Sequence, residues 1–484
     1  MAIGMTIRDL RDFISVLEKE DELIRVKKEV ESGEEISTII WEINNRLGPA
    51  VLFEKVKGYK YPVFANGLGT ARKFALSLGW PKDLTLKQLR DKYIPYLNPK
   101  TWIKPKLVSD GPCKEVVVKE KDVDLYEFPI LKWMHIDSAP YITMPSIVAK
   151  DPSKGVNVGM YRMQLIDKRT TGLMCNVFQD IGIFLARAAA AGKKEMEVAV
   201  TVGVSPATYI ATTTKLPFGA CEFDLAGALQ GEPIELVKCE TVDLEVPARS
   251  ELVIEGTVKI GERVEAEGPF SEWHGYWEEP MSVNLFKVKC ITHRKDMIYQ
   301  VCMESHPESE GEMLRFVQQL STFHVACQQR VKGFVDSWLP PKSRGFKAVV
   351  SIKKRYPGWG KQALYQTFGA PYVGASVNYV VVVDGDIDVT DDEQVEWAVS
   401  TRVDAERDVV ITPPQSTYPL NPAARSRSDG AWKTTDFALC SKWGVDATLK
   451  TRGEGYERPT PIPTVPTKEM LDKVKERWRE YGFR

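Results

Sequence analysis

The chain has 484 residues, too many for one compact hydrophobic core, so we expect two or three domains. Hydrophobic residues make up 43% and charged residues 27%, the balance of a soluble globular protein. The formal net charge of −1 excludes the strongly basic surface that phosphate-backbone contacts need, so we expect no nucleic acid partner.

The first residues predict an amphipathic helix, with Leu10, Phe13, Ile14 and Leu17 on one face, and not a secretory signal. No apolar run reaches the ~20 residues that cross a bilayer, so no membrane association is expected. The eight cysteines form no CxxC pair, which argues against zinc or iron–sulfur sites and is typical of reduced thiols in the cytoplasm.

In chain order, residues 1–112 mix helices and short strands and form the first predicted domain. Residues 113–315 are strand-rich, because β-branched or alternating stretches recur between Gly, Pro and Asp. The predicted strands are 115–118, 146–149, 197–202, 251–258 and 283–290, interrupted by an alanine-rich helix at 183–191 that Gly192 ends.

Residues 316–457 predict an α/β domain, with a helix near 312–332, strands at 347–353 and 378–383, and a helix at 393–400. The strand at 378–383 is almost wholly apolar, as expected when both faces of a sheet are covered. Residues 458–484 combine a stiff spacer with four prolines and a last amphipathic helix. That helix is equally suited to packing on its own domain or on another subunit.

Three segments have residue types suited to chemistry. In 157–162, Asn157 offers a carbonyl oxygen to a hard divalent metal, and Arg162 can bind a carboxylate in bidentate fashion. In 267–276, Glu272 and His274 point to the same side if the segment is extended. Turn asparagines, surface arginines and solvated acids are commonplace, so neither segment is specific alone.

The third segment, 303–312, holds four glutamates directly after an apolar strand. Acidic residues favour the N-terminus of a helix, so a solvated helix start explains them. Alternatively, paired carboxylates above a pocket can hold one proton at neutral pH, as acid catalysis requires.

Taken together, in this order and separation, seven segments resemble the UbiD family. They are NVGMYR at 157–162, the block at 225–248, EGPFSEWHGY at 267–276, IYQ at 298–300 with the acidic run, and the blocks at 353–362, 400–408 and 443–450. The resemblance covers nearly the whole chain. Within the family, the carboxylases of phenylphosphate and arenes are one type that the chain resembles.

The resemblance implies reversible (de)carboxylation of aromatic or α,β-unsaturated acids with prenylated FMN, a divalent metal (Mn²⁺ or Mg²⁺) and K⁺. It also implies an α+β fold, in which a split β-barrel flavin-binding domain is joined to an α/β oligomerisation domain and a C-terminal amphipathic helix. The partners that it implies are an aromatic acid and CO2, a second copy of the chain in a homodimer or higher oligomer, and possible other carboxylase subunits.

Residue by residue, the resemblance gives Arg162 the substrate carboxylate and Glu310 the proton transfer, with Glu304 or Glu308 as the acid paired with Glu310. It makes Asn157 and Glu272 metal ligands and places Met160, Tyr161 and Arg162 at the flavin. Gln179 stands where the family usually has a histidine ligand. A glutamine carbonyl can coordinate Mg²⁺ or Mn²⁺, His274 can fill the gap instead, or the site is weakened.

The expected function is therefore that of a cytoplasmic carboxy-lyase acting on an aromatic acid, with its physiological direction open. One alternative is a UbiD-like subunit of low activity within a multi-subunit aryl carboxylase. The other is a metal-dependent hydrolase that uses Glu272, His274 and the acidic run without flavin.

Overall fold

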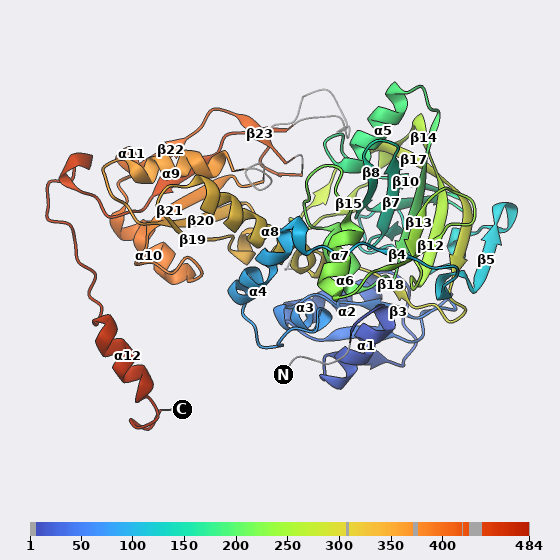
Figure 1. The fold of residues 1–484 in the computed structure, drawn as a ribbon, viewed down its shortest axis with the longest axis horizontal. Coiled ribbons are helices and arrows are strands. Elements are labelled where there is room, and N and C mark those ends of the chain that lie inside the picture. Colours follow the sequence, from blue (N-terminus) through green and yellow to red (C-terminus); the bar gives the residue numbers. More distant parts are fainter. Residues whose placement is uncertain (1–5, 306–308, 371–375, 419, 425–437, 484) are drawn as a thin grey trace.

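The computed structural model describes residues 6–305, 309–370, 376–418, 420–424 and 438–483 (Figure 1). In this part of the chain no helix is both apolar and long enough to span a membrane. The mixed α+β class expected from the sequence is confirmed.

The N-terminal region packs helices on a small sheet. Its helices are α1 (Leu10–Lys19), α2 (Glu34–Asn45), α3 (Ala71–Ser77) and α4 (Leu86–Tyr93). The sheet order is β1 (Leu23–Val26), β2 (Ala50–Phe53), β3 (Val63–Ala65) and β18 (Tyr299–Gln300). Because β18 comes from far along the chain, this sheet joins the first residues to the segment that precedes the acidic run.

The middle of the chain forms one large antiparallel sheet within the described residues. Its order is β6 (Tyr141–Ile142), β9 (Met163–Asp167), β10 (Thr170–Leu173), β17 (Met281–His293), β14 (Leu252–Glu267), β11 (Glu195–Val202), β7 (Ser146–Asp151) and β8 (Gly155–Gly159), with β5 (Val116–Lys119) also paired to β17. The order has two ends at β6 and β8, so the expected split barrel is here an open sheet.

Helices and small strand pairs accompany this sheet. They are α5 (Asp180–Ala190), α6 (Pro206–Thr212) and α7 (Glu222–Gln230), the hairpin of β15 (Phe270–Ser271) and β16 (Trp277–Glu278), and a sheet of β13 (Glu245–Pro247), β12 (Glu235–Lys238) and β4 (Lys106–Leu107). The predicted strands at 115–118, 146–149, 197–202, 251–258 and 283–290 overlap β5, β7, β11, β14 and β17.

The C-terminal half builds a mixed sheet, in which the three central strands are parallel and the two edge strands are antiparallel to their neighbours. Its order is β19 (Phe334–Trp338), β20 (Lys347–Ile352), β21 (Tyr379–Asp384), β25 (Trp443–Asp446) and β22 (Val409–Ile411), and β23 (Gln415–Thr417) pairs with β24 (Ala438–Cys440). Its helices are α9 (Trp359–Phe368), α10 (Asp392–Arg402) and α11 (Ala405–Asp408). The strand β21 is buried through Val380–Val383, as its apolar run predicts.

Helix α8 (Glu310–Arg330) connects the two halves (Figure 1). One of its faces places Leu314 and Val317 in the core shared with α1 and α3, and another places Leu320 and Phe323 in the core of the C-terminal sheet. The N-terminus of α8 is therefore held between two separate hydrophobic cores.

The last helix, α12 (Lys468–Glu476), stands apart from the rest of the molecule on an extended arm (Figure 1). It contains no buried residue, and Met470 and Trp478 are 50% and 43% exposed.

Candidate active site

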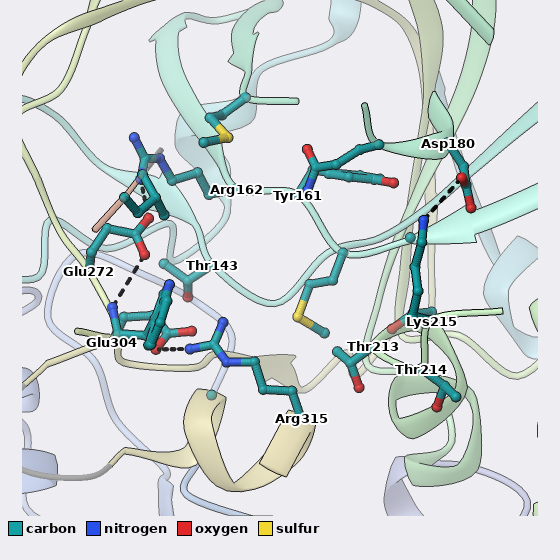
Figure 2. Close-up of a pocket in the computed structure, with 18 of the residues that line it drawn as sticks. Thr143, Tyr161, Arg162, Asp180, Thr213, Thr214, Lys215, Glu272, Glu304 and Arg315 are labelled. Atoms are coloured by element: carbon teal, nitrogen blue, oxygen red, sulfur yellow. Dashed lines mark hydrogen bonds and ion pairs between the residues drawn. The ribbon is translucent and has the colours of Figure 1, made fainter. Parts of the chain in front are cut away.

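A pocket of about 300 Å³ opens beside the large sheet, where the strand ends, the α6–α7 connection, the β15–β16 hairpin and the start of α8 meet. Its lining divides into two ends (Figure 2). Arg162, Glu272 and Glu304 lie at one end, and Asp180, Lys215, Thr213 and Thr214 lie at the other.

Arg162 is the centre of the first end. It lies in the short connection between β8 and β9, and its guanidinium is buried. The group donates hydrogen bonds to both oxygens of Glu267, at 2.9 and 2.8 Å, and through Nη1 to Glu272 and, at 2.8 Å, to Glu278. It also stacks over the ring of Phe270, 4.7 Å from the ring centroid. Three carboxylates thus surround one cation.

The burial and the charges of this cluster shift the pKa values of its members. Burial acts to lower the pKa of Arg162, but the three carboxylates raise it overall, so the arginine stays charged. Burial also raises the pKa of Glu278 to about 8, against the opposing charge of Arg162. With its pKa of about 8, Glu278 is the carboxylate of this cluster that holds a proton at neutral pH.

The second end of the pocket brings Asn157 and Glu222 together. The Asn157 amide donates to Glu222 at 3.0 Å, and the Val158 amide donates to the other Glu222 oxygen at 2.6 Å. Burial raises the pKa of Glu222 to about 8. The side-chain carbonyl oxygen of Asn157 is buried and accepts no hydrogen bond within the described part of the chain. Gln179, at the N-cap of α5, lines the same end, and its side-chain oxygen accepts the Asn176 amide at 2.7 Å.

This second end fits a cation and an anion. Asn157, Gln179 and Glu222 supply the oxygen atoms that hard divalent metals prefer, and the free acceptor of Asn157 is explained by such an ion. Within the described part of the chain, no group of three or more His, Cys, Asp or Glu side chains could hold a metal. Lys215, 3.3 Å from Asp180, and the hydroxyls of the preceding threonines are suited to a phosphate.

Glu310 lies elsewhere and is not among the described residues that line the pocket. Its carboxylate is buried at the start of α8 and accepts the backbone amides of Asn66 at 2.7 Å and Leu68 at 2.8 Å. Burial raises the pKa of Glu310 to about 7, while the charge of buried Lys73 lowers it. Glu310 therefore fastens the turn after β3 to α8, and the acid predicted to face the substrate serves as an anchor between two regions.

The other acids of the same run have different positions. Glu304 lines the pocket, where it pairs with Arg315 at 3.5 Å and accepts from Ser309 at 3.3 Å, and burial raises its pKa. Glu308 lies outside the described residues. Glu304 thus lies at the same end of the pocket as Arg162 and Glu272 (Figure 2).

The remaining predicted residues divide in the same way. Met160 and Tyr161 line the pocket beside Arg162. Glu272 lines it too, but at the arginine end, where Arg162 binds one of its oxygens, and not with Asn157. His274 is not among the described lining residues, and its Nδ1 accepts the Tyr276 amide at 3.2 Å.

Three acids near these ends were not singled out from the sequence. Glu267 is the first residue of the EGPFSE segment, five residues before Glu272, and Glu278 is the last residue of the β15–β16 hairpin. Glu222 begins α7, three residues before the block at 225–248. The only available signal was their closeness to conspicuous segments, because isolated acids at strand ends and helix starts are ordinary.

Three domain models of one family cover most of the chain. They are the N-terminal, Rift-related and C-terminal domains of 3-octaprenyl-4-hydroxybenzoate carboxy-lyase (UbiD), matched at residues 14–93, 106–307 and 313–447. An uncharacterized protein of Archaeoglobus fulgidus is 37% identical, with 98% of this chain and 99% of the relative covered.

Two solved structures show the same likeness. Vanillic acid decarboxylase of Sedimentibacter hydroxybenzoicus, in its closed form, has a TM-score of 0.87 and 31% identity, with 98% of this chain and 100% of that chain covered. An evolved dimeric form of the UbiD-class enzyme HmfF of Pelotomaculum thermopropionicum, in complex with prenylated FMN, has a TM-score of 0.77 and 31% identity, with 96% and 100% covered. The chain therefore belongs to the UbiD family of carboxy-lyases.

Proposed function

We propose that this protein catalyses the reversible (de)carboxylation of an aromatic acid with prenylated FMN, and that Arg162 and Glu272 act on the substrate. The observation that carries the proposal is the buried cluster of Arg162 with Glu267, Glu272 and Glu278 at one end of the pocket. Support also comes from the related enzymes, one a decarboxylase of vanillic acid and the other bound to prenylated FMN.

Asn157, Gln179 and Glu222 would hold a divalent metal, Mn²⁺ or Mg²⁺, and Lys215 with the preceding threonines would hold the flavin phosphate. Met160 and Tyr161 would face the cofactor from the same wall. When bound, prenylated FMN supplies an electron sink for the bond between the substrate carbon and its carboxylate. In this proposal the flavin would lie between the metal end and the arginine end of the pocket.

Glu272 suits proton transfer better than Glu310. It lines the pocket, one of its oxygens accepts a hydrogen bond from Arg162, and the other accepts the backbone amide of Trp273 at 3.2 Å. In decarboxylation Glu272 gives a proton to the carbon that has lost CO2, and in carboxylation it removes that proton. Arg162 orients the carboxylate of the substrate, while Glu267 fixes the plane of the guanidinium.

The proton that Glu272 needs is available because the cluster is short of positive charge. A single carboxylate beside Arg162 would be ionised and unable to donate. With Glu267 and Glu278 on the same arginine, the cluster retains a proton near neutral pH. The second acidic group that the resemblance implies is therefore supplied by Glu267 and Glu278 in this proposal.

The test is to produce the protein together with a prenyltransferase that makes the cofactor. Its visible spectrum, metal content and exchange of labelled CO2 into aryl acids are then measured. Glu272→Gln should abolish exchange and retain flavin, whereas Glu279→Gln, at an exposed neighbour of the same hairpin, should behave as wild type. Full exchange by Glu272→Gln would refute the assigned role.

A second candidate is a subunit with little activity of its own in a larger carboxylase. The engaged oxygen of Gln179 favours it, because a glutamine already bound to Asn176 is a weaker metal ligand than a free imidazole. Bound flavin without exchange on any aryl acid would support this alternative. The hydrolase alternative loses support, since His274 does not line the pocket with Glu272.

We also propose that the C-terminal arm binds a second copy of the chain. The helix α12 presents Met470 and Leu471, Trp478 follows two residues after the helix ends, and all three are exposed. An amphipathic helix whose apolar residues meet no core of its own is suited to an apolar surface on another subunit.

A further inference from the structure

A second cavity lies on the other side of the β15–β16 hairpin from the active-site pocket. Its volume is about 340 Å³, and its walls include Thr38 and Trp41 of α2, Ser271 and Trp277 of the hairpin, and Ser305. Among the described residues, Glu272 is the one that lines both this cavity and the pocket. Glu272, the proposed proton donor, therefore lines both the active-site pocket and the second cavity.

The inner part of this cavity is polar. Ser271 and Ser305 are only 6% and 5% exposed, and the hydroxyl of each is buried and makes no hydrogen bond with the residues that the structure describes. Buried hydroxyls are almost always satisfied, and where the protein supplies no partner an ordered water does so. A cavity of this size has room for several waters beside these two hydroxyls and Glu272.

The outer part of the cavity reaches the surface. Thr38 is exposed on α2, and Tyr276 and Trp277 are 65% and 39% exposed. The cavity thus runs from solvent-exposed side chains at one side to the buried residues Ser271, Ser305 and Glu272 at the other.

We propose that this second cavity is a proton port, through which water recharges Glu272 from the face opposite the substrate. The proposal rests on the role of Glu272 in the proposed function. In decarboxylation, the carbon that has lost CO2 takes the proton of Glu272, and one proton from solvent passes along the waters at Ser305 and Ser271 to the Glu272 carboxylate. In carboxylation the same proton leaves by the same route. No electrons are exchanged in the port.

A separate port has a physical advantage. A flavin and an aromatic acid bound together would exclude water from the pocket, so a proton would not reach Glu272 from that side until the product left. A water chain entering behind the hairpin removes this dependence, because it touches Glu272 without crossing the substrate.

The first test is independent of activity. A high-resolution crystal structure of the flavin-loaded protein should show ordered waters that join the Ser271 and Ser305 hydroxyls to the Glu272 carboxylate. A dry cavity, or waters that stop short of Glu272, would overturn the proposal.

The second test narrows the mouth of the cavity with Thr38→Trp, and its control is Glu34→Trp, an exposed residue of the same helix that lines neither cavity. The readout is deuterium exchange at the ring C–H of a decarboxylated product. We expect Thr38→Trp to slow this exchange at least fivefold and to raise its solvent isotope effect at least twofold. KM, flavin content and Tm should match those of the control.

An unchanged rate and isotope effect in Thr38→Trp, with the mouth shown to be blocked in its crystal structure, would overturn the port. A wild-type protein that exchanges with no aryl acid would instead refute the proposed function, and the waters seen at Glu272 would still decide whether the port exists.

Discussion

Arg162 and Glu267 form a buried bidentate ion pair, in which Nε and Nη2 of the arginine lie 2.9 and 2.8 Å from the two carboxylate oxygens. This pairing fixes the plane of the guanidinium and leaves Nη1 for Glu272 and Glu278. The acid proposed to transfer the proton is therefore positioned by an arginine that another acid has already oriented.

Arg162→Lys should lower CO2 exchange at least 100-fold, because one ammonium group cannot reproduce two parallel hydrogen bonds and a third contact. Flavin content should change little, since the metal and phosphate end of the pocket is separate (Figure 2). Isotope exchange and the visible spectrum of the purified variant measure both effects. Retention of more than a tenth of the wild-type exchange would contradict the positioning role.

Glu310→Gln should destabilise the protein without removing its chemistry. A glutamine can accept only one of the two backbone amides of Asn66 and Leu68, so we expect a loss of about 1–3 kcal/mol in the free energy of unfolding. Denaturant unfolding measures this loss. Exchange per flavin-loaded molecule should stay within threefold of wild type, and its abolition in a folded variant would restore Glu310 as the catalytic acid.

Glu222→Gln should weaken metal retention at least tenfold, because the pocket loses the carboxylate among its three oxygen donors. Flavin should be lost together with the metal if the metal and Lys215 bind the flavin phosphate jointly. Metal analysis after gel filtration gives the result, with Glu245→Gln, an exposed position on β13, as the matched control. Equal metal content in the two variants would show that the metal binds elsewhere.

Asp336 provides a pH-dependent contribution to stability. Burial acts to raise the pKa of this carboxyl, but hydrogen bonds from His324 and Lys87 and the charge of Arg90 bring it below its usual value. Because the pKa is lower in the folded state, the stabilisation is present above the unfolded pKa near ~3.9 and is lost as the pH falls below it.

Asp336→Asn should therefore lower the free energy of unfolding by about 1–3 kcal/mol at pH 7, since buried Arg90 loses one of its two carboxylate partners and keeps Asp91 at 2.8 Å. The difference between the variant and wild type should narrow below pH 4. Urea unfolding at both pH values measures it. If the difference in free energy of unfolding between the variant and wild type instead grows below pH 4, the pKa of Asp336 is not lowered in the folded protein.

Truncation after residue 457 should reduce the mass of the assembly in solution to that of a smaller oligomer, because it removes α12 and its exposed apolar residues. Light scattering coupled to gel filtration gives the mass directly. Trp478→Ser should also shift the protein toward the smaller oligomer. If the truncated chain has the same oligomeric state as the full chain, the C-terminal arm is not part of the subunit interface.

Much of the fold could be predicted from the sequence, because the signals are local. The β-branched or alternating stretches at 251–258 and 283–290 predict strands, and they overlap β14 and β17. The apolar run at 378–383 predicts a strand with both faces covered, and β21 is buried. Two features could not be predicted from local patterns: β8 forms an open edge of the large sheet, and β18 pairs with β3 from far along the chain. Both depend on how distant segments are arranged in space.

For the site, the sequence by itself determined which segments matter, since the pocket draws residues from 157–162, 267–276 and the acidic run. The sequence did not distinguish the roles of the individual glutamates in these segments. Glu267, Glu272 and Glu310 are alike as isolated carboxylates. Only the tertiary structure places Glu267 and Glu272 on Arg162 and Glu310 on the backbone amides of the turn after β3. The role of a carboxylate depends on the burial, charges and donors around it, and those arise when strands and helices far apart in the chain pack together.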